Sequence, residues 1–167
     1  MADETANGAA GAAPEAGNQP QFALQRIYIK DASFEAPNAP QVFQEQGQPE
    51  LQLNLGQKVA GLGEGVFEVV LTVSLTCTLN GKNAYLAEVQ QAGIFTVRGF
   101  PEEHLGAILA TACPNTLFPF AREAICDLVT KGGFPQLLLA PVNFEILYAQ
   151  ELQRRMAGNN APQGASH

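Results

Sequence analysis

Few side chains in this 167-residue sequence could carry nucleophilic or acid–base chemistry. A thiol enzyme needs a base within hydrogen-bond reach of its cysteine, and the two histidines are His104 and the final residue, His167. Cys113 with His104 is the pair that such an enzyme would use. However, Cys113 precedes a proline at an expected helix end, whereas a helix N-terminus is what lowers a thiol pKa. We therefore expect no catalytic residues and no enzyme activity, with this pair as the alternative.

Motifs for cofactors and metals are also missing. The glycines of residues 61–65 come without the lysine and the following G-K-[ST] of a phosphate-binding loop. The three cysteines lack C-x-x-C spacing, which argues against a metal centre and against a disulfide framework. We expect no cofactor, no metal and no structural disulfide, and hence a reducing compartment.

The charge balance narrows the possible partners. Sixteen acidic residues against nine basic ones give a formal charge of −7, which argues against nucleic acid or anionic lipid as the main partner. Basic or amphipathic polypeptides remain possible. No apolar run reaches the ~18 residues of a membrane span, and the first twenty residues do not resemble a secretory signal. We expect a cytoplasmic protein that does not insert into membranes.

The elements that must position these residues begin with strands. Residues 66–79 alternate between apolar and polar side chains, which predicts a long strand with one face in a core. The Asn80-Gly81 pair favours a type I′ hairpin turn, and residues 85–97 predict the returning strand. Residues 22–35 alternate more loosely and predict a strand, in which Ile27, Ile29 and Asp31 share a face unless a bulge intervenes. The apolar side of the strand predicted at residues 66–79 consists of Phe67, Val69, Leu71, Val73, Leu75, Cys77 and Leu79.

Between these strands, residues 37–49 predict a long connection because of their prolines. Residues 50–55 predict a short strand, and residues 56–65 a glycine-rich loop. After the strands, a helix is expected from Pro101, with a break at residues 113–115. A second helix is expected at residues 119–130 and a last one, capped by Asn143, through Met156. The further ranges in this prediction are a disordered arm at 1–20, one folded unit at 21–156 and a flexible tail at 157–167. Strands followed by helices indicate the α+β class.

Four segments, residues 25–40, 88–95, 113–123 and 134–144, resemble the SecB protein-export chaperones. They cover most of residues 22–156 in the order and spacing of that family. The resemblance implies a cytosolic homotetramer built as a dimer of dimers, in which each subunit carries a four-stranded antiparallel sheet and helices lie between the dimers. It also implies that the protein holds unfolded precursor proteins and passes them to SecA, the translocation ATPase, without hydrolysing ATP.

The resemblance further implies a client-binding groove and a SecA-docking surface. Leu51, Leu53 and Leu55, with Phe43 in the long connection, match the groove, and the alternative is that the leucines face the subunit core. The docking surface would receive the basic, zinc-binding C-terminal segment of SecA. Its matching positions are Asp31, Glu35, Leu86 and Glu88. Positions near the subunit contacts of the family are matched by Val89 and Gln91.

Two departures from the family pattern bear on function. Many relatives carry a tryptophan at the position of Gly47. The glycine of this chain therefore leaves the rim of the groove without that aromatic side chain. The tail at residues 157–167 contains no acid, whereas familiar members often have an acidic tail. An alternative function on the same fold is a general antiaggregation or antitoxin-associated chaperone without a role in export.

Overall fold

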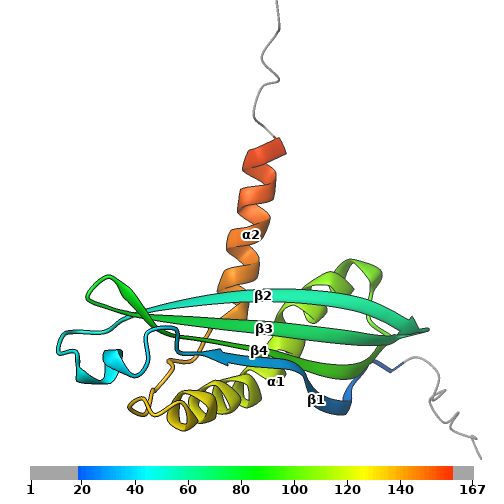
Figure 1. The fold of residues 1–167 in the computed structure, drawn as a ribbon. Coiled ribbons are helices and arrows are strands. Elements are labelled where there is room, and N and C mark those ends of the chain that lie inside the picture. The colour runs from blue at the N-terminus through cyan, green and yellow to red at the C-terminus, as the bar shows by residue number, and fades with distance from the viewer. Residues whose placement is uncertain (1–18, 160–167) are drawn as a thin grey trace, which may run out of the picture.

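The computed structural model describes residues 19–159, so most of the expected arm and tail lie outside the described residues. One four-stranded antiparallel sheet has the strand order β1-β4-β3-β2 and is followed by helices, as predicted (Figure 1). The described residues form two α-helices, whereas three were predicted. The elements are β1 Gln21–Glu35, a 3-10 helix Gln41–Gln44, β2 Glu50–Gly63, β3 Val66–Leu79, β4 Lys82–Arg98, α1 Glu102–Lys131 and α2 Phe144–Asn159.

The central hairpin of β3 and β4 follows the predicted alternation. The side chains of Val69, Leu71, Val73 and Leu75 are at most 1 % exposed and face α1, and we call this side the inner face of the sheet. The opposite side is the outer face. Asn80 and Gly81 have φ angles of 52° and 76°, the left-handed pair that a type I′ turn requires.

Strand β2 is longer than predicted, and the expected loop at residues 56–65 is wrong. The strand pairs with β3 as far as Gly63, with Gly56 opposite Thr72 and Gly61 opposite Phe67. A long neighbouring strand offers backbone partners along its whole length, and those hydrogen bonds do not depend on side chains. Tertiary pairing therefore outweighs the weak strand preference of glycine.

Strand β1 contains two register shifts, one between Leu24 and Arg26 and one between Ile29 and Asp31. Each shift adds a residue and reverses which face the following side chains take. Ile29 lies opposite the inner-face residue Gln91, whereas Asp31 lies opposite Gln90 on the outer face. A single alternation that places Ile29 and Asp31 on one face is therefore wrong.

The two helices predicted between residues 101 and 130 are one helix, α1, with Pro114 and Pro119 inside it. A proline inside a helix costs about 3 kcal/mol. Burying a large apolar side chain contributes about 1.5–3 kcal/mol. Several such side chains recur at every fourth position and pack against the sheet, so their burial outweighs the break signal. This stripe is Leu109, Cys113, Leu117, Ala121, Ile125 and Val129, each at most 8 % exposed.

Helix α2 starts as predicted, because the Ile146 N–H donates to Asn143 Oδ1 at 3.0 Å. It ends at Asn159, three residues beyond the predicted Met156. Figure 1 shows α2 crossing the strand direction and projecting past the edge of the sheet near β2. None of the helices within residues 19–159 combines the length and apolarity that a bilayer crossing requires.

Candidate functional site

An apolar hollow of about 500 Å³ opens where β2, the 3-10 segment and the chain after α1 meet. The Phe134 ring centroid lies 4.6 Å from that of Tyr85 and 5.0 Å from that of Phe43. Phe43 is 51 % exposed, so its ring forms part of the open rim. We call this site the aromatic hollow, defined by Phe43, Leu51, Tyr85, Phe134 and Leu137.

Gly47 lies at the edge of the aromatic hollow. A Cβ added there would come within 2.6 Å of Asn80 Oδ1. Asn80, the first turn residue of the β3–β4 hairpin, donates from Nδ2 to the Gln46 carbonyl oxygen at 3.1 Å and to Glu45 Oε2 at 3.2 Å. The hairpin tip therefore fills space that a larger residue at position 47 would need.

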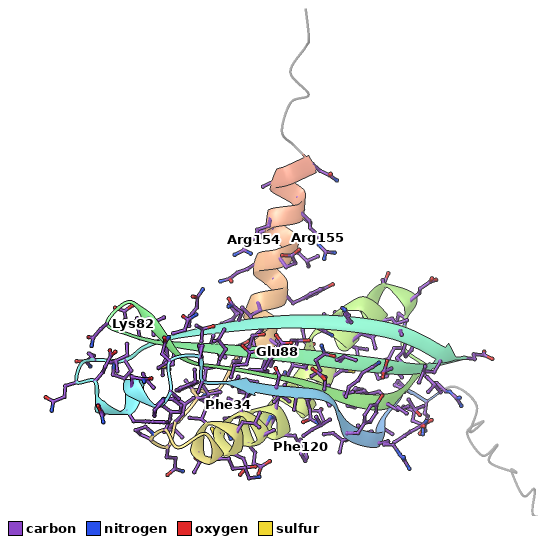
Figure 2. The ribbon with its side chains drawn as sticks, in the orientation of Figure 1. Phe34, Lys82, Glu88, Phe120, Arg154 and Arg155 are labelled. Atoms are coloured by element: carbon purple, nitrogen blue, oxygen red, sulfur yellow. The ribbon has the colours of Figure 1, made fainter. Side chains whose placement is uncertain are left out.

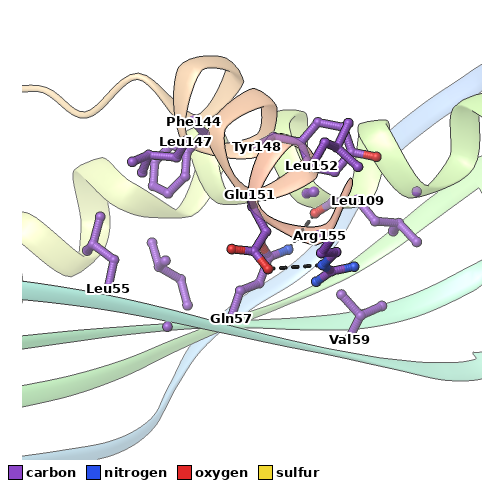
Figure 3. A pocket seen from close by; sticks show the side chains of 14 residues that line it. Leu55, Gln57, Val59, Leu109, Phe144, Leu147, Tyr148, Glu151, Leu152 and Arg155 are labelled. Atoms are coloured by element: carbon purple, nitrogen blue, oxygen red, sulfur yellow. Dashed lines mark hydrogen bonds and ion pairs between the residues drawn. The ribbon is translucent and has the colours of Figure 1, made fainter. Parts of the chain in front are cut away.

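A second hollow, of about 630 Å³, lies between β2, the first half of α1 and α2 (Figure 3). Gln57 Nε2 donates to the Leu109 carbonyl oxygen at 2.6 Å, which ties β2 to α1 across its floor. Arg155 pairs with Glu151 at 2.9 Å on its rim. We call this site the α2 hollow, defined by Leu55, Val59, Leu109, Leu147, Tyr148 and Leu152.

The three predicted leucines of β2 connect the two hollows. Leu51 is 48 % exposed and lines the aromatic hollow, whereas Leu55 lines the α2 hollow. Leu53 and Leu55 are half-buried and also pack against the core. Core and groove are thus not exclusive readings for these leucines, and their role in binding stays a prediction.

The four predicted docking residues lie together on the outer face. The strand pairing puts Glu35 opposite Leu86 and Glu88 opposite Ser33, with Asp31 next along β1. Glu35, Leu86 and Glu88 line one shallow depression, and the Ser74 hydroxyl donates to Glu88 Oε2 at 2.6 Å. Figure 2 labels Glu88 on the sheet. We call Asp31, Glu35, Leu86 and Glu88 the acidic strip.

Val89 and Gln91 lie on the inner face, at 0 % and 3 % exposure. Val89 belongs to the hydrophobic core, and Gln91 Nε2 donates to the Tyr28 carbonyl oxygen at 2.9 Å. Their burial within the subunit leaves their side chains almost no surface for another subunit. A contact between subunits at these positions stays a prediction.

The thiol and the imidazole of the alternative enzyme hypothesis do not meet. Cys113 comes nine residues after His104 in α1, which is about two and a half turns and places the two side chains on opposite sides of the helix. Cys113 is fully buried, and burial raises its pKa to about 12. The His104 side chain is 63 % exposed, with Nε2 3.8 Å from Glu103. Residues 19–159 also contain no group of three or more metal-binding side chains.

The residues that close the two hollows were not among the predicted groove residues. Phe134 lines the aromatic hollow and Leu152 lines the α2 hollow. The hollows form because segments far apart in the chain converge on β2. A motif within one segment carries no signal for that convergence, although the density of aromatics around residue 134 is a partial one.

The comparisons with known proteins agree with one another. The family model for the preprotein translocase subunit SecB matches residues 15–155. The protein-export protein SecB of Xanthomonas oryzae pv. oryzae is 54 % identical over 155 residues, which cover 93 % of this chain and 91 % of the relative. That of Xylella fastidiosa is 55 % identical over 155 residues, covering 93 % and 90 %. A solved SecB-like chaperone of Mycobacterium tuberculosis, in complex with a peptide from an antitoxin, has a TM-score of 0.62 at 21 % identity over 73 % of this chain and 91 % of that one, which shows the fold alone.

Proposed function

The chain belongs to the SecB family of protein-export chaperones, and we propose that it holds unfolded precursor proteins and delivers them to SecA without hydrolysing ATP. Membership of the family gives it a chaperone role in export. The observation that carries the holding function is the pair of open apolar hollows joined by the leucines of β2. An unfolded chain exposes the apolar side chains that such hollows bury.

Promiscuous binding follows from the chemistry of the hollows. Burial of apolar surface is non-directional and contributes about 25 cal/mol per Å², so many client sequences satisfy it. Leu51 and Leu55 are four residues apart on β2, or ~14 Å at ~3.4 Å per residue. An extended client segment of similar length reaches from one hollow to the other. Weak contacts in both hollows then add within one bound chain.

Delivery to SecA is proposed to occur at the acidic strip. Three carboxylates, Asp31, Glu35 and Glu88, lie on one face around the apolar Leu86, which suits a basic segment that also buries some apolar surface. The proposed ligand is the basic, zinc-binding C-terminal segment of SecA. Because this surface is open to solvent, the attraction should weaken as salt is added.

Assembly into a homotetramer, as a dimer of dimers in the cytoplasm, completes the proposal. Apolar side chains left exposed on the isolated subunit support it. Ile29 at the edge strand β1 is 52 % exposed, and Phe120 on α1 is 49 % exposed on the side away from the sheet (Figure 2). Contacts between copies would cover such surfaces.

The test separates holding from delivery. Asp31, Glu35 and Glu88 are changed together to lysine, and affinity is measured for a denatured precursor and for zinc-loaded SecA. A unit charge pair at 4 Å in water is worth about 1 kcal/mol, so reversing three charges should weaken SecA binding more than 100-fold, on the order of three such terms. Client affinity should be unchanged. Glu64→Lys, a charge change at an exposed residue of the turn between β2 and β3, is the control.

Unchanged SecA affinity in the triple variant would remove the proposed delivery site. Persistent client holding would then leave a general antiaggregation chaperone on the same fold. That alternative is not favoured, because the relatives at 53–55 % identity are named for protein export.

A further inference from the structure

The second irregularity of β1 decides where the acidic strip points. Ile29 pairs with Gln91 and Asp31 pairs with Gln90, so Lys30 is an extra residue with no partner of its own on β4. In a regular strand, residues two apart share a face. The extra residue instead sends Ile29 to the inner face and Asp31 to the outer face. Asp31 and Glu35 are outward only because of this bulge.

A carboxylate on the outer face holds the bulge. Glu68 of β3 accepts a hydrogen bond from the Tyr28 hydroxyl and from Lys30 Nζ, the latter at 2.9 Å and 3.0 Å to its two oxygens. These bonds pass over β4, because β1 and β3 are not neighbours in the sheet. The Glu68 side chain is only 15 % exposed, and the hydrogen bonds from Tyr28 and Lys30 lower its pKa. Glu68 thus binds both Lys30, which is the extra residue, and Tyr28, which lies two residues before it.

A buried amide holds the same place from the inner face. Gln91 Nε2 donates to the Tyr28 carbonyl oxygen at 2.9 Å, and Gln91 is 3 % exposed. A bulge disrupts the regular ladder, so backbone groups beside it depend on other partners. Tyr28 is therefore fixed through its hydroxyl on one face and through its backbone on the other.

We propose that Glu68 and Gln91 are positioning residues that fix the bulge at Lys30 and thereby aim Asp31 and Glu35 at the docking partner. The inference rests on the proposed function of the acidic strip. The apolar residues of β1 require an extra residue somewhere after Ile29, because Phe34 packs on the inner face against Tyr85 at 5.9 Å between ring centroids. That requirement does not determine where after Ile29 the extra residue lies. The hydrogen bonds of Glu68 and Gln91 fix its position at Lys30.

The test uses a change that keeps the net charge. Lys30→Met with Glu68→Gln removes one charge of each sign, so long-range attraction for a basic ligand is preserved. The probe is a zinc-loaded synthetic peptide of the basic C-terminal segment of SecA, titrated by calorimetry. The loss of one net hydrogen-bond contribution predicts about 3- to 10-fold weaker peptide binding. Amide hydrogen exchange at residues 30–33 should become faster, whereas affinity for an unfolded client should stay the same.

Two further variants complete the test. Tyr28→Phe removes one hydrogen bond to Glu68 without changing the net charge, so it should weaken peptide binding in the same way but by less. This variant takes the place of the double variant if the double variant folds poorly. Deleting Lys30 in the Glu68→Gln background should restore peptide affinity, because Ile29 and Asp31 then take opposite faces in a regular strand.

Peptide affinity and hydrogen exchange that both match the unmodified protein would overturn the positioning role. Equal losses of peptide and client affinity would also overturn it, since they would indicate general destabilisation. Glu88→Lys checks the premise separately. If that variant binds the peptide normally, the docking proposal fails. Hydrogen exchange at residues 30–33 in the Glu68 variants still shows whether the contacts of Glu68 stabilise the bulge.

Discussion

Leu51 offers the sharpest test of the client groove. Its side chain is 48 % exposed at the mouth of the aromatic hollow, so about half of it is free to contact a client. Full burial of a leucine side chain contributes about 1.5–3 kcal/mol. The exposed half is then worth about 1 kcal/mol in client binding, and the buried half about 1 kcal/mol in folding. Leu51→Ala should weaken client binding about fivefold and lower the free energy of unfolding by about 1 kcal/mol.

The matched control is Leu62→Ala. Leu62 lies on the same strand and is 54 % exposed, but it lines neither hollow. Its replacement should leave client affinity unchanged. Affinity for a fluorescently labelled denatured precursor, measured beside urea unfolding followed by circular dichroism, gives both quantities. Equal effects of the two replacements on affinity would refute the assignment of Leu51 to the groove.

Three further outcomes are expected. The pKa of Glu68 lies below the ordinary 4.5 because Tyr28 and Lys30 donate hydrogen bonds to it, so its stabilising contribution is present above that value and is lost as the pH falls through the lowered pKa. The free energy of unfolding, measured by urea titration, should therefore fall less between about pH 5 and about pH 3 in Glu68→Gln than in the unmodified protein. An equal fall in both proteins would contradict this account. Burial raises the pKa of Cys113 to about 12, so iodoacetamide at about pH 8 should modify the partly exposed Cys126 first in the folded protein, and mass spectrometry showing equal rates would contradict it. Gly81→Ala should destabilise the protein by about 1 kcal/mol in urea unfolding because its φ is +76°, whereas Gly61→Ala, with open space around the added Cβ, should have little effect, and equal effects would exclude the turn geometry as the cause.

Local patterns predicted the part of the fold that local physics controls. The alternation of β3 gave both ends of the strand, and Asn80-Gly81 gave the hairpin, because both depend on neighbouring residues. The extent of β2 and the continuity of α1 depend on distant partners. Backbone pairing with β3 overrides the glycines of β2, and packing on the sheet overrides Pro114 and Pro119.

The candidate sites divide in a similar way. Residue types and family spacing placed the acidic strip on one face, but for β1 the simple alternation was wrong and the bulge produced the outward direction. Phe43 and the leucines of β2 were predicted as groove residues from the family resemblance, but the opposite walls of the hollows were not, since Phe134 meets Phe43 and Tyr85 only after α1 has packed along the sheet. A sequence shows which side chains are apolar along a strand, but not which distant segment leaves a gap above them.

The sheet presents the leucines of β2 and the acidic strip back to back, on opposite surfaces of a single layer. A client and the translocation motor would therefore not compete for space on one subunit, and a loaded carrier could dock without first releasing its cargo. Because the two sites lie on opposite faces, a client bound at the hollows would not touch a partner bound at the acidic strip. Any preference of the motor for loaded carriers would then have to come from direct contact between motor and cargo.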